Sequence, residues 1–148
     1  MFTRKRACRL SPYLMFDGTA RQAMEFYASV FGGELDVLTY AEGMGEEGEL
    51  KDRLMHSSLY LERGAHVMAA DTFPGQSASL GTVALSTAEE DSCEENARIA
   101  SWWEKLAPES RITVPLDAAP WDPNSRYGQL TDPYGVEWMF MVGPTEQG

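Results

Sequence analysis

The sequence predicts an α+β fold in which one order of elements, a strand, a helix and three strands, occurs twice along 148 residues. Three observations lead to this prediction. Short apolar runs that end in turn residues are typical of strands. Two longer segments carry apolar residues at helical spacing. Sliding the chain by about 70 residues lays the first strand and helix over a later strand and helix. Residue identity between the halves is weak, so the repeat is one of structural pattern.

The first half opens with a short apolar run, Leu10–Asp17, which ends at Gly18 and predicts a strand. The spacing of apolar residues then becomes that of a helix over Ala20–Phe31. Its stripe consists of Ala20, Ala23, Met24, Tyr27, Val30 and Phe31. Thr19 and Gln22 have the spacing of a capping box, and Gly32-Gly33 favours the end of the helix.

Three strands are expected to complete the first half, because β-type runs are separated by turn residues. They are Glu34–Ala41, Leu54–Leu61 and Ala65–Asp71, the last two joined by a short hairpin at Glu62-Arg63-Gly64. Residues 42–52 hold three glycines and are rich in acids, which predicts a mobile loop or lid.

The second half repeats this order. Leu80–Ser86 predicts a strand, and Thr87 with Glu90 repeats the capping-box spacing before a helix that runs to about Leu106. Strands are expected at Ile112–Leu116, Arg126–Asp132 and Val136–Val142, with a tight Asp132-Pro133-Tyr134-Gly135 turn between the last two. Asp132 is therefore interpreted as structural, and Trp138 as a core residue.

Two tryptophans stand next to each other in the second predicted helix. Adjacent helical residues do not share a face. We therefore expect one of Trp102 and Trp103 in the core and the other partly exposed or at an interface.

The charge of the protein disfavours two classes of partner. The chain is acidic, with 23 Asp and Glu against 12 Lys and Arg. This excess disfavours nucleic acid and anionic membranes, both of which select clustered cations. The sequence shows no long apolar run and no signal peptide, and its two cysteines, Cys8 and Cys93, form no CxxC motif. These features predict a cytoplasmic protein.

Several stretches, in this order and spacing, resemble one protein family. They are Leu10 to Gly18, Glu25-Phe26-Tyr27, Phe31 to Glu34, Met55-His56, Val67 to Asp71, Pro120-Trp121, Tyr127-Gly128 and Asp132 to Trp138. The chain resembles the PhnB-like branch of the vicinal oxygen chelate superfamily, which includes glyoxalases, bleomycin-resistance proteins and extradiol dioxygenases. This branch is often labelled 3-demethylubiquinone-9 3-methyltransferase. The sequence shows no glycine-rich, adenosine-binding turn after its first strand, so we give that label little weight.

The resemblance implies a domain organisation. It implies a single glyoxalase-like domain over 8–145, built of two βαβββ modules at about 8–75 and 76–145. A basic extension, 1–7, precedes the domain. Each module is expected to curl around a cavity, and a homodimer is expected to complete it.

The resemblance also identifies four positions that hold a divalent metal ion in metal-using relatives. They fall at Pro12 (with Ser11 as an alternative register), near Asp71, at Thr82 and at Met139. Pro, Thr and Met are poor ligands for Mg²⁺, Mn²⁺, Zn²⁺ or Ni²⁺. We therefore expect no standard metal site and no cofactor, with a divalent metal at a shifted site as the alternative.

His56 and Asp71 are the candidate catalytic residues. Strand alternation places His56 on a comparatively polar face with Ser58 and Tyr60. His56 acts as a base or a single metal ligand, or else is a hydrogen-bonded structural histidine. Asp71 points into the cavity beside Met139, or else accepts backbone N–H groups as a turn carboxylate. His66 is expected to be exposed.

Aromatic and polar residues are the candidate ligand contacts. Aromatic rings can stack on a flat or cationic ligand. The expected ligand-binding residues are Tyr13, Thr82, Trp121, Tyr127 and Met139.

Two functions follow. The first is a PhnB-like protein that binds an unknown small molecule without the standard metal, as bleomycin-resistance relatives do. The alternative is a metal-assisted lyase, isomerase or dioxygenase-type enzyme that uses His56 and Asp71. The acid-rich stretches 42–52 and 89–95 are interpreted as solvated surface.

Overall fold

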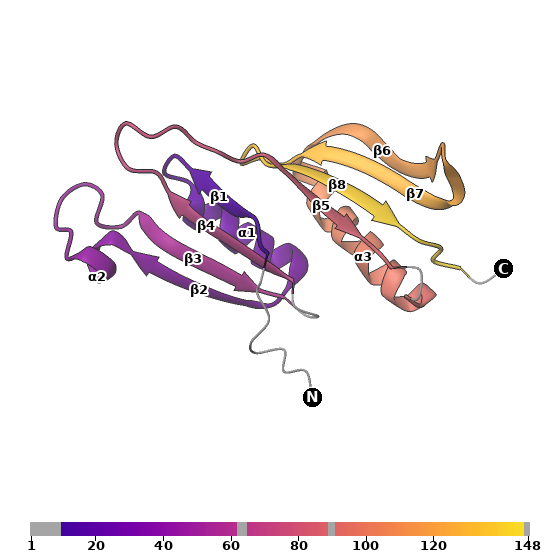
Figure 1. The fold of residues 1–148 in the computed structure, drawn as a ribbon, viewed down its shortest axis with the longest axis horizontal. Coiled ribbons are helices and arrows are strands. Elements are labelled where there is room, and N and C mark those ends of the chain that lie inside the picture. The colour runs from indigo at the N-terminus through magenta and orange to yellow at the C-terminus, as the bar shows by residue number, and fades with distance from the viewer. Residues whose placement is uncertain (1–9, 62–64, 89–90, 147–148) are drawn as a thin grey trace. The chain divides into compact units, whose positions relative to one another are not determined.

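The structure, a computed structural model, describes residues 10–61, 65–88 and 91–146. The predicted hairpin turn at 62–64 and the basic extension at 1–7 lie outside these residues. Figure 1 shows the elements in chain order. They are β1 (Tyr13–Phe16), α1 (Ala20–Phe31), β2 (Glu34–Thr39), α2 (Tyr40–Met44), β3 (Leu54–Tyr60), β4 (His66–Asp71), β5 (Thr82–Ser86), α3 (Cys93–Leu106), the 3₁₀ helix η3 (Ala107–Glu109), β6 (Arg111–Ala119), β7 (Asp122–Thr131) and β8 (Glu137–Val142).

The strands form two four-stranded sheets with the same topology. The first sheet has the order β1-β4-β3-β2, and the second has the order β5-β8-β7-β6. In each sheet the first strand pairs in parallel with the last one, and the other described pairings are antiparallel. The predicted α+β class with paired βαβββ modules is therefore confirmed.

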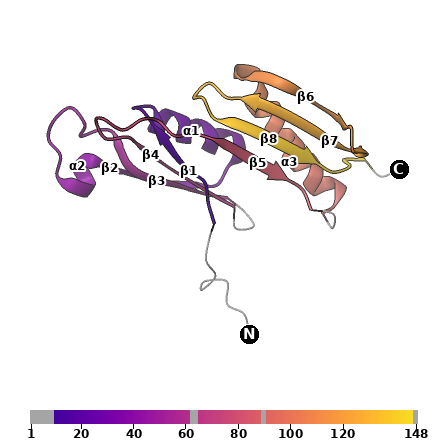
Figure 2. The same ribbon diagram turned by 45° about the horizontal axis from the view of Figure 1, so that its top comes forward.

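One helix lies against one face of each sheet, α1 on the first and α3 on the second (Figures 1 and 2). Side chains alternate between the two faces of a strand. Leu14 and Phe16 of β1 are buried on the α1 side, and Trp138, Phe140 and Val142 of β8 on the α3 side. We call the opposite face of each sheet its open face.

The predicted first helix is confirmed, but its predicted cap is wrong. Thr19 precedes α1 without any side-chain capping bond. The Asp71 carboxylate, from the end of β4, instead accepts hydrogen bonds from the backbone N–H groups of Gly18 and Ala20. A distant residue thus provides the side-chain acceptor at this helix start, and its donors differ from the Gln22 N–H that a capping box assigns to the threonine.

Two other helix starts also differ from the expectation. A capping box between Thr39 and Glu42 starts the short helix α2, inside what was expected to be strand and loop. In the second half, Ser92 caps α3 by accepting the Glu95 N–H, so the helix does not start at Thr87. Glu90, the predicted partner of Thr87, lies outside the described residues.

The prediction that one of the two adjacent tryptophans is partly exposed is wrong, because both are buried. Trp103 packs edge-on against Phe140, with ring centroids 5.3 Å apart. Trp102 is covered by the guanidinium of Arg98, whose Cζ lies 5.2 Å from its ring centroid. The stem of a long charged side chain can cover apolar surface, so two neighbouring positions on α3 are both shielded from water.

The structural roles expected of Trp138 and Asp132 are confirmed. Trp138 is buried, and its indole Nε1–H donates to Asp132 Oδ2 over 2.8 Å. The other carboxylate oxygen of Asp132 accepts the backbone N–H groups of Tyr134 and Val136. These three bonds hold the turn between β7 and β8.

The described residues fall into two compact units. One holds the residues up to Ala28 together with Gly32–Ala78, and the other holds Ser29–Phe31 and the residues from Ser79 on. No helix in the described part of the chain is long and apolar enough to cross a membrane.

Candidate functional site

Strand register brings two of the predicted site residues together on the open face of the first sheet. Tyr13 of β1 is paired with Met68 of β4, and Met68 is paired with Ser58 of β3. His56 lies two residues before Ser58 and therefore points to the same face. Residues far apart in the sequence, Tyr13 and His56, meet there.

These residues form a hydrogen-bonded chain. The Tyr13 hydroxyl lies 2.8 Å from His56 Nδ1, and His56 Nε2 lies 3.1 Å from Ser58 Oγ. The Tyr13 and His56 rings are also in contact, with centroids 5.6 Å apart. This series of hydrogen bonds begins at Ser58, which is buried, and ends at Tyr13, which is 41% exposed.

Burial favours one direction for the protons in this chain. Ser58 is only 4% exposed, and its hydroxyl is bonded to no other acceptor among the described residues. An unmet buried donor costs about 1–3 kcal/mol. Ser58 therefore donates to His56 Nε2, and His56 Nδ1–H donates to the Tyr13 oxygen. The Tyr13 O–H proton is then free to bind a hydrogen-bond acceptor.

The phenol of Tyr13 stays neutral at physiological pH. Burial raises its pKa above the ordinary value of 10.0, and the neighbouring Tyr40 raises the pKa further. A neutral phenol is both a donor and an acceptor. Tyr13 can thus orient a carbonyl or another acceptor group against the open face.

His66 also lies on this sheet and is half-buried, whereas exposure was expected. Its ring stacks on Tyr60, with centroids 4.7 Å apart and an interplanar angle of 16°. Its Nδ1 lies 3.0 Å from the Ser11 hydroxyl. These contacts give His66 a packing role at the start of β4.

The structure does not bring Asp71 together with His56. Asp71 is paired in register with Phe16, which is buried on the α1 side, so its side chain points away from the open face. Its Oδ1 accepts from Gly18 and Ala20 over 2.9 and 3.0 Å, and its Oδ2 accepts from Leu54 N over 2.9 Å. This is the backbone-binding alternative, with donors different from those next to it in sequence.

The other candidate residues gather on the second sheet. Thr82 is paired with Glu137, and Met139 with Gln129, so period two places all four on the open face with Tyr127. Thr82 Oγ1 donates to Glu137 Oε1 over 2.9 Å, and the Tyr127 hydroxyl donates to Gln129 Oε1 over 2.9 Å. These bonds fix the polar groups of this face.

Trp121 lies in the turn between β6 and β7 and is 66% exposed. Its ring meets the Tyr127 ring edge-on, with centroids 5.3 Å apart. An exposed indole that is held by a second aromatic ring offers a rigid apolar surface to a ligand. The second sheet thus carries an aromatic surface, the Trp121–Tyr127 pair, in addition to its polar groups.

Equivalent strand positions in the two halves are 69 residues apart, one fewer than the expected offset. The Met68 N–H donates to Pro12 O, and the Glu137 N–H donates to Gly81 O. Tyr13 and Thr82 are therefore equivalent, whereas the sequence had related Pro12 to Thr82. The open-face position of the first strand holds a phenol in one module and a hydroxyl in the other.

The donor groups present do not fit the divalent metal ion that the resemblance implies. Asp71 is occupied by three backbone donors, and Met139 offers only a thioether. Tyr13 is a neutral phenol, and a metal-binding phenol is ionised. In the part of the chain that the structure describes, no three His, Cys, Asp or Glu side chains gather as a metal-binding group.

The sequence did not predict a role for three polar residues of these faces. They are Ser58, Glu137 and Gln129. Strand alternation alone places Ser58 beside His56. The positions of Glu137 and Gln129 depend on pairing between strands, which the sequence does not show.

Comparisons with known proteins agree with this architecture. Residues 8–141 match the family described as 3-demethylubiquinone-9 3-methyltransferase. The chain is 26% identical over 144 residues to protein YjdN of Escherichia coli, covering 90% of this chain and 94% of that protein.

Solved structures show the same similarity. Protein PA1353 of Pseudomonas aeruginosa is 26% identical, with a TM-score of 0.71 over 90% of this chain and 96% of that one. A PhnB protein of Bacillus cereus is also 26% identical, with a TM-score of 0.58 over 92% and 100%. A glyoxalase/bleomycin resistance protein/dioxygenase superfamily member from Sphaerobacter thermophilus shares the fold at 17% identity and a TM-score of 0.52, over 93% and 98%. The chain belongs to the PhnB-like 3-demethylubiquinone-9 3-methyltransferase family, and it shares its fold with a member of the glyoxalase/bleomycin resistance protein/dioxygenase superfamily.

Proposed function

We propose that this protein binds an organic small molecule on the open face of its first sheet, without the divalent metal ion of the superfamily. Tyr13 is the anchoring residue, and it donates its free O–H proton to an acceptor atom of the ligand. His56 and Ser58 set the direction of that proton. For the open face of the second sheet, we propose separately that Thr82, Trp121, Tyr127 and Met139 are ligand-binding residues.

The observation that carries this proposal is the Tyr13–His56–Ser58 chain. It occupies a position equivalent to one that holds a metal ligand in relatives, and it offers a polarised hydrogen-bond donor instead. The Tyr13 hydroxyl lies on the same face as the apolar side chains of Met15 and Met68. A placed polar group among apolar side chains is typical of small-molecule sites.

The metal-free part of the proposal has a direct test. Elemental analysis of the purified protein is expected to show no stoichiometric Mn, Fe, Ni or Zn. Thermal melting with each of these ions is expected to leave the transition unchanged, because only binding to the native state stabilises it. Stoichiometric metal or a large shift would overturn this reading.

The role of Tyr13 is tested by substitution. Compounds from a metabolite library that raise the melting temperature of the wild type are titrated against Tyr13→Phe and His56→Ala. We expect affinity to fall by about tenfold or more, since a hydrogen bond to a bound ligand is worth on the order of 1 kcal/mol or more. Tyr134→Phe, in the β7–β8 turn, is the matched control. Unchanged affinity in both variants would remove these residues from the site.

The enzymatic alternative, a lyase, an isomerase or a dioxygenase, receives less support. It joined His56 and Asp71 in one shifted site, and the two side chains point to opposite faces of the first sheet. His56 alone can still exchange a proton with a ligand. Turnover of a bound compound that is lost in His56→Ala would favour the enzyme. The homodimer stays a prediction, which sedimentation equilibrium tests.

A further inference from the structure

The Trp121–Tyr127 pair presents a large aromatic surface to solvent in the second unit. Trp121 is 66% exposed, and of the large apolar side chains that the structure describes only Leu10 is more exposed. A single exposed apolar residue is common on protein surfaces, so the residues around Trp121 decide whether this surface suits a ligand.

The two rings stand at an angle to each other. Their planes differ by 64°, with centroids 5.3 Å apart, and the Tyr127 hydroxyl donates to Gln129 Oε1 over 2.9 Å, which holds the phenol ring. Rings at such an angle offer two aromatic walls to one rounded group, whereas a stacked pair offers one flat face. The face of each ring carries negative electrostatic potential, and a cation within about 6 Å of a ring centroid is attracted to it.

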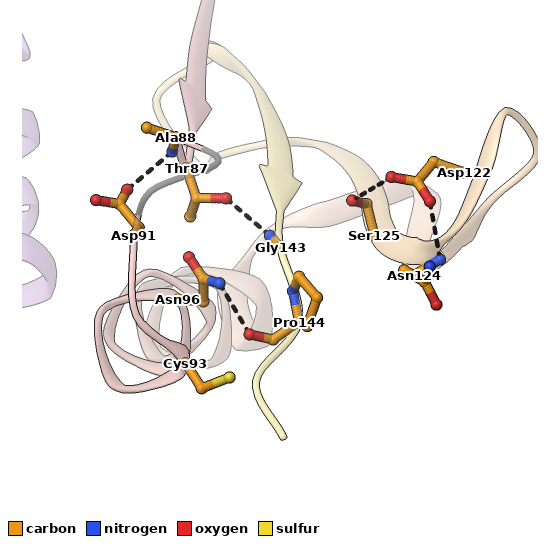
Figure 3. Close-up of a pocket in the computed structure, with 10 residues that line it drawn as sticks. All are labelled: Thr87, Ala88, Asp91, Cys93, Asn96, Asp122, Asn124, Ser125, Gly143 and Pro144. Atoms are coloured by element: carbon orange, nitrogen blue, oxygen red, sulfur yellow. Dashed lines mark hydrogen bonds between the residues drawn. The ribbon is translucent and has the colours of Figure 1, made fainter. Parts of the chain in front are cut away.

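The turn that carries Trp121 is also held in place. Asp122 follows Trp121 in the chain, and its carboxylate accepts hydrogen bonds from Asn124 N over 3.1 Å and from Ser125 Oγ over 2.9 Å. Figure 3 shows both bonds at the edge of a neighbouring cavity that these three residues help to line. The indole is thus ordered before a ligand arrives, which lowers the entropic cost of binding.

Asp117 adds a negative charge beside the rings. It lies directly opposite Tyr127 in the β6–β7 pairing, and opposite residues of an antiparallel pair have Cβ atoms about 4.5–5.5 Å apart on one face. Its Oδ1 accepts the N–H of Ala118 over 2.8 Å, and the carboxylate forms no ion pair with a described residue. Arg126, next to Tyr127, is paired with Val142, which is buried on the α3 side, so strand alternation directs Arg126 to the opposite face.

The other neighbours of the rings disfavour an ammonium group that carries N–H bonds. Met141 of β8 lies opposite Tyr127 and offers an apolar surface with only a weak thioether acceptor. Gln129 Oε1 already accepts the Tyr127 hydroxyl. A primary ammonium would therefore have three N–H groups for one carboxylate, and a donor removed from water without a partner costs free energy. A quaternary ammonium has no N–H group, and its methyl groups suit aromatic walls.

We propose that Trp121, Tyr127 and Asp117 bind the quaternary ammonium group of a small organic molecule. The two rings contact the methyl groups and attract the positive charge, which the Asp117 carboxylate balances. The net charge of the protein, −11, adds a long-range attraction for cations. This proposal rests on the ligand-binding role proposed above for Trp121 and Tyr127 on the second sheet.

Three probes separate charge from shape. Choline carries the quaternary ammonium, 3,3-dimethyl-1-butanol replaces its nitrogen by carbon, and ethanolamine carries a primary ammonium. Each is titrated into ¹⁵N-labelled protein, with NaCl as the control for ionic strength. The shift of the Trp121 indole N–H signal, assigned by its absence in Trp121→Phe, gives the affinity. We expect choline to bind about fivefold or more tightly than either other probe, because an exposed cation–π contact is worth about a factor of two to five for each ring.

Variants test the contacts, with the backbone amide signal of Tyr127 as the reporter in all of them. Trp121→Ala is expected to lower the affinity for choline about fivefold or more. Asp117→Asn keeps the shape of the side chain but removes its charge, and is expected to lower the affinity about two- to fivefold. The matched controls lie in the first unit, where Phe73→Ala removes another exposed aromatic ring and Asp36→Asn another carboxylate. Both are expected to leave the affinity unchanged.

Each other outcome overturns the proposal. Equal binding of 3,3-dimethyl-1-butanol would mean that the surface recognises only an apolar shape, and equal binding of ethanolamine would reduce the site to one carboxylate. An equal loss in Asp36→Asn and Asp117→Asn would reduce the effect to net charge. Absence of any shift with choline would mean that the rings bind no quaternary ammonium.

The same signals distinguish a failure of this proposal from a failure of the proposed function. A library compound that is not a quaternary ammonium, and whose affinity falls in Trp121→Ala, would overturn the ligand class and leave the ligand-binding role of the face intact. If Trp121→Ala changes the affinity of no compound, the ligand-binding role of Trp121 falls as well.

Discussion

Replacing Asp71 by alanine removes the carboxylate that joins three elements of the first unit. Its oxygens accept the N–H groups of Gly18 before α1, Ala20 at its start and Leu54 at the start of β3. The Ala20 and Leu54 bonds are buried. A buried donor left without a partner costs about 1–3 kcal/mol, so the two together cost about 2–6 kcal/mol. This is a large part of the 5–15 kcal/mol that stabilises a typical domain.

Urea unfolding, followed by far-ultraviolet circular dichroism, measures this loss. Asp17→Ala is the matched control, because that carboxylate is mostly exposed and its Arg53 partner lies 3.4 Å away. Exposed pairs contribute about 0–1 kcal/mol. A free energy of unfolding for Asp71→Ala within about 0.5 kcal/mol of the wild type would refute the reasoning, since it would show that these donors find other partners at little cost.

Two further predictions concern pH and packing. Burial and the neighbouring Tyr40 raise the pKa of Tyr13. Burial and Asp71 raise the pKa of Tyr40, and Arg53 lowers it by a smaller amount. As pH rises, the unfolded chain therefore loses these phenol protons first, and the free energy of unfolding should fall above about pH 10. Denaturant titrations from pH 9 to 11 should show that this free energy falls less steeply with pH in Tyr40→Phe than in the wild type. An equal dependence on pH in the two proteins would contradict this prediction. Gly128→Ala would place a Cβ atom 2.8 Å from Trp103, and should destabilise the protein by about 1–3 kcal/mol in the same assay. Gly48→Ala, on an exposed loop, is its control, and equal values for the two variants would count against the packing argument.

Helix α1 and the order of helices and strands along the chain could be predicted because they depend on local patterns. The apolar spacing from Ala20 to Phe31 defines that helix by itself. The same holds for the short runs that became β3, β4 and β8. The Thr39–Glu42 capping box is also a local pattern, but it lies at the end of an apolar run that favours a strand.

The candidate site could be predicted only in part, because its contacts join distant strands. The sequence predicts Tyr13 and His56 as separate site residues. Their hydrogen bond spans 43 positions and depends on β1 pairing with β4 rather than with β2. The capping role of Asp71 depends on the end of one strand meeting the start of a helix. Local sequence spacing cannot predict that contact, and it indicated Thr19, the residue next to the helix, as the cap.

The pairing of β1 with β4 also bears on how the chain folds as it is synthesised. Tyr13 pairs with Met68, so the first strand leaves the ribosome 55 residues ahead of β4, its neighbour among the described strands of the sheet. At about 5–20 residues per second, Leu14 and Phe16 wait on the order of 3–11 seconds for that neighbour. During this interval α1 is the first element available to cover them, because it follows directly in the chain. The second module meets the same delay, as Thr82 pairs with Glu137.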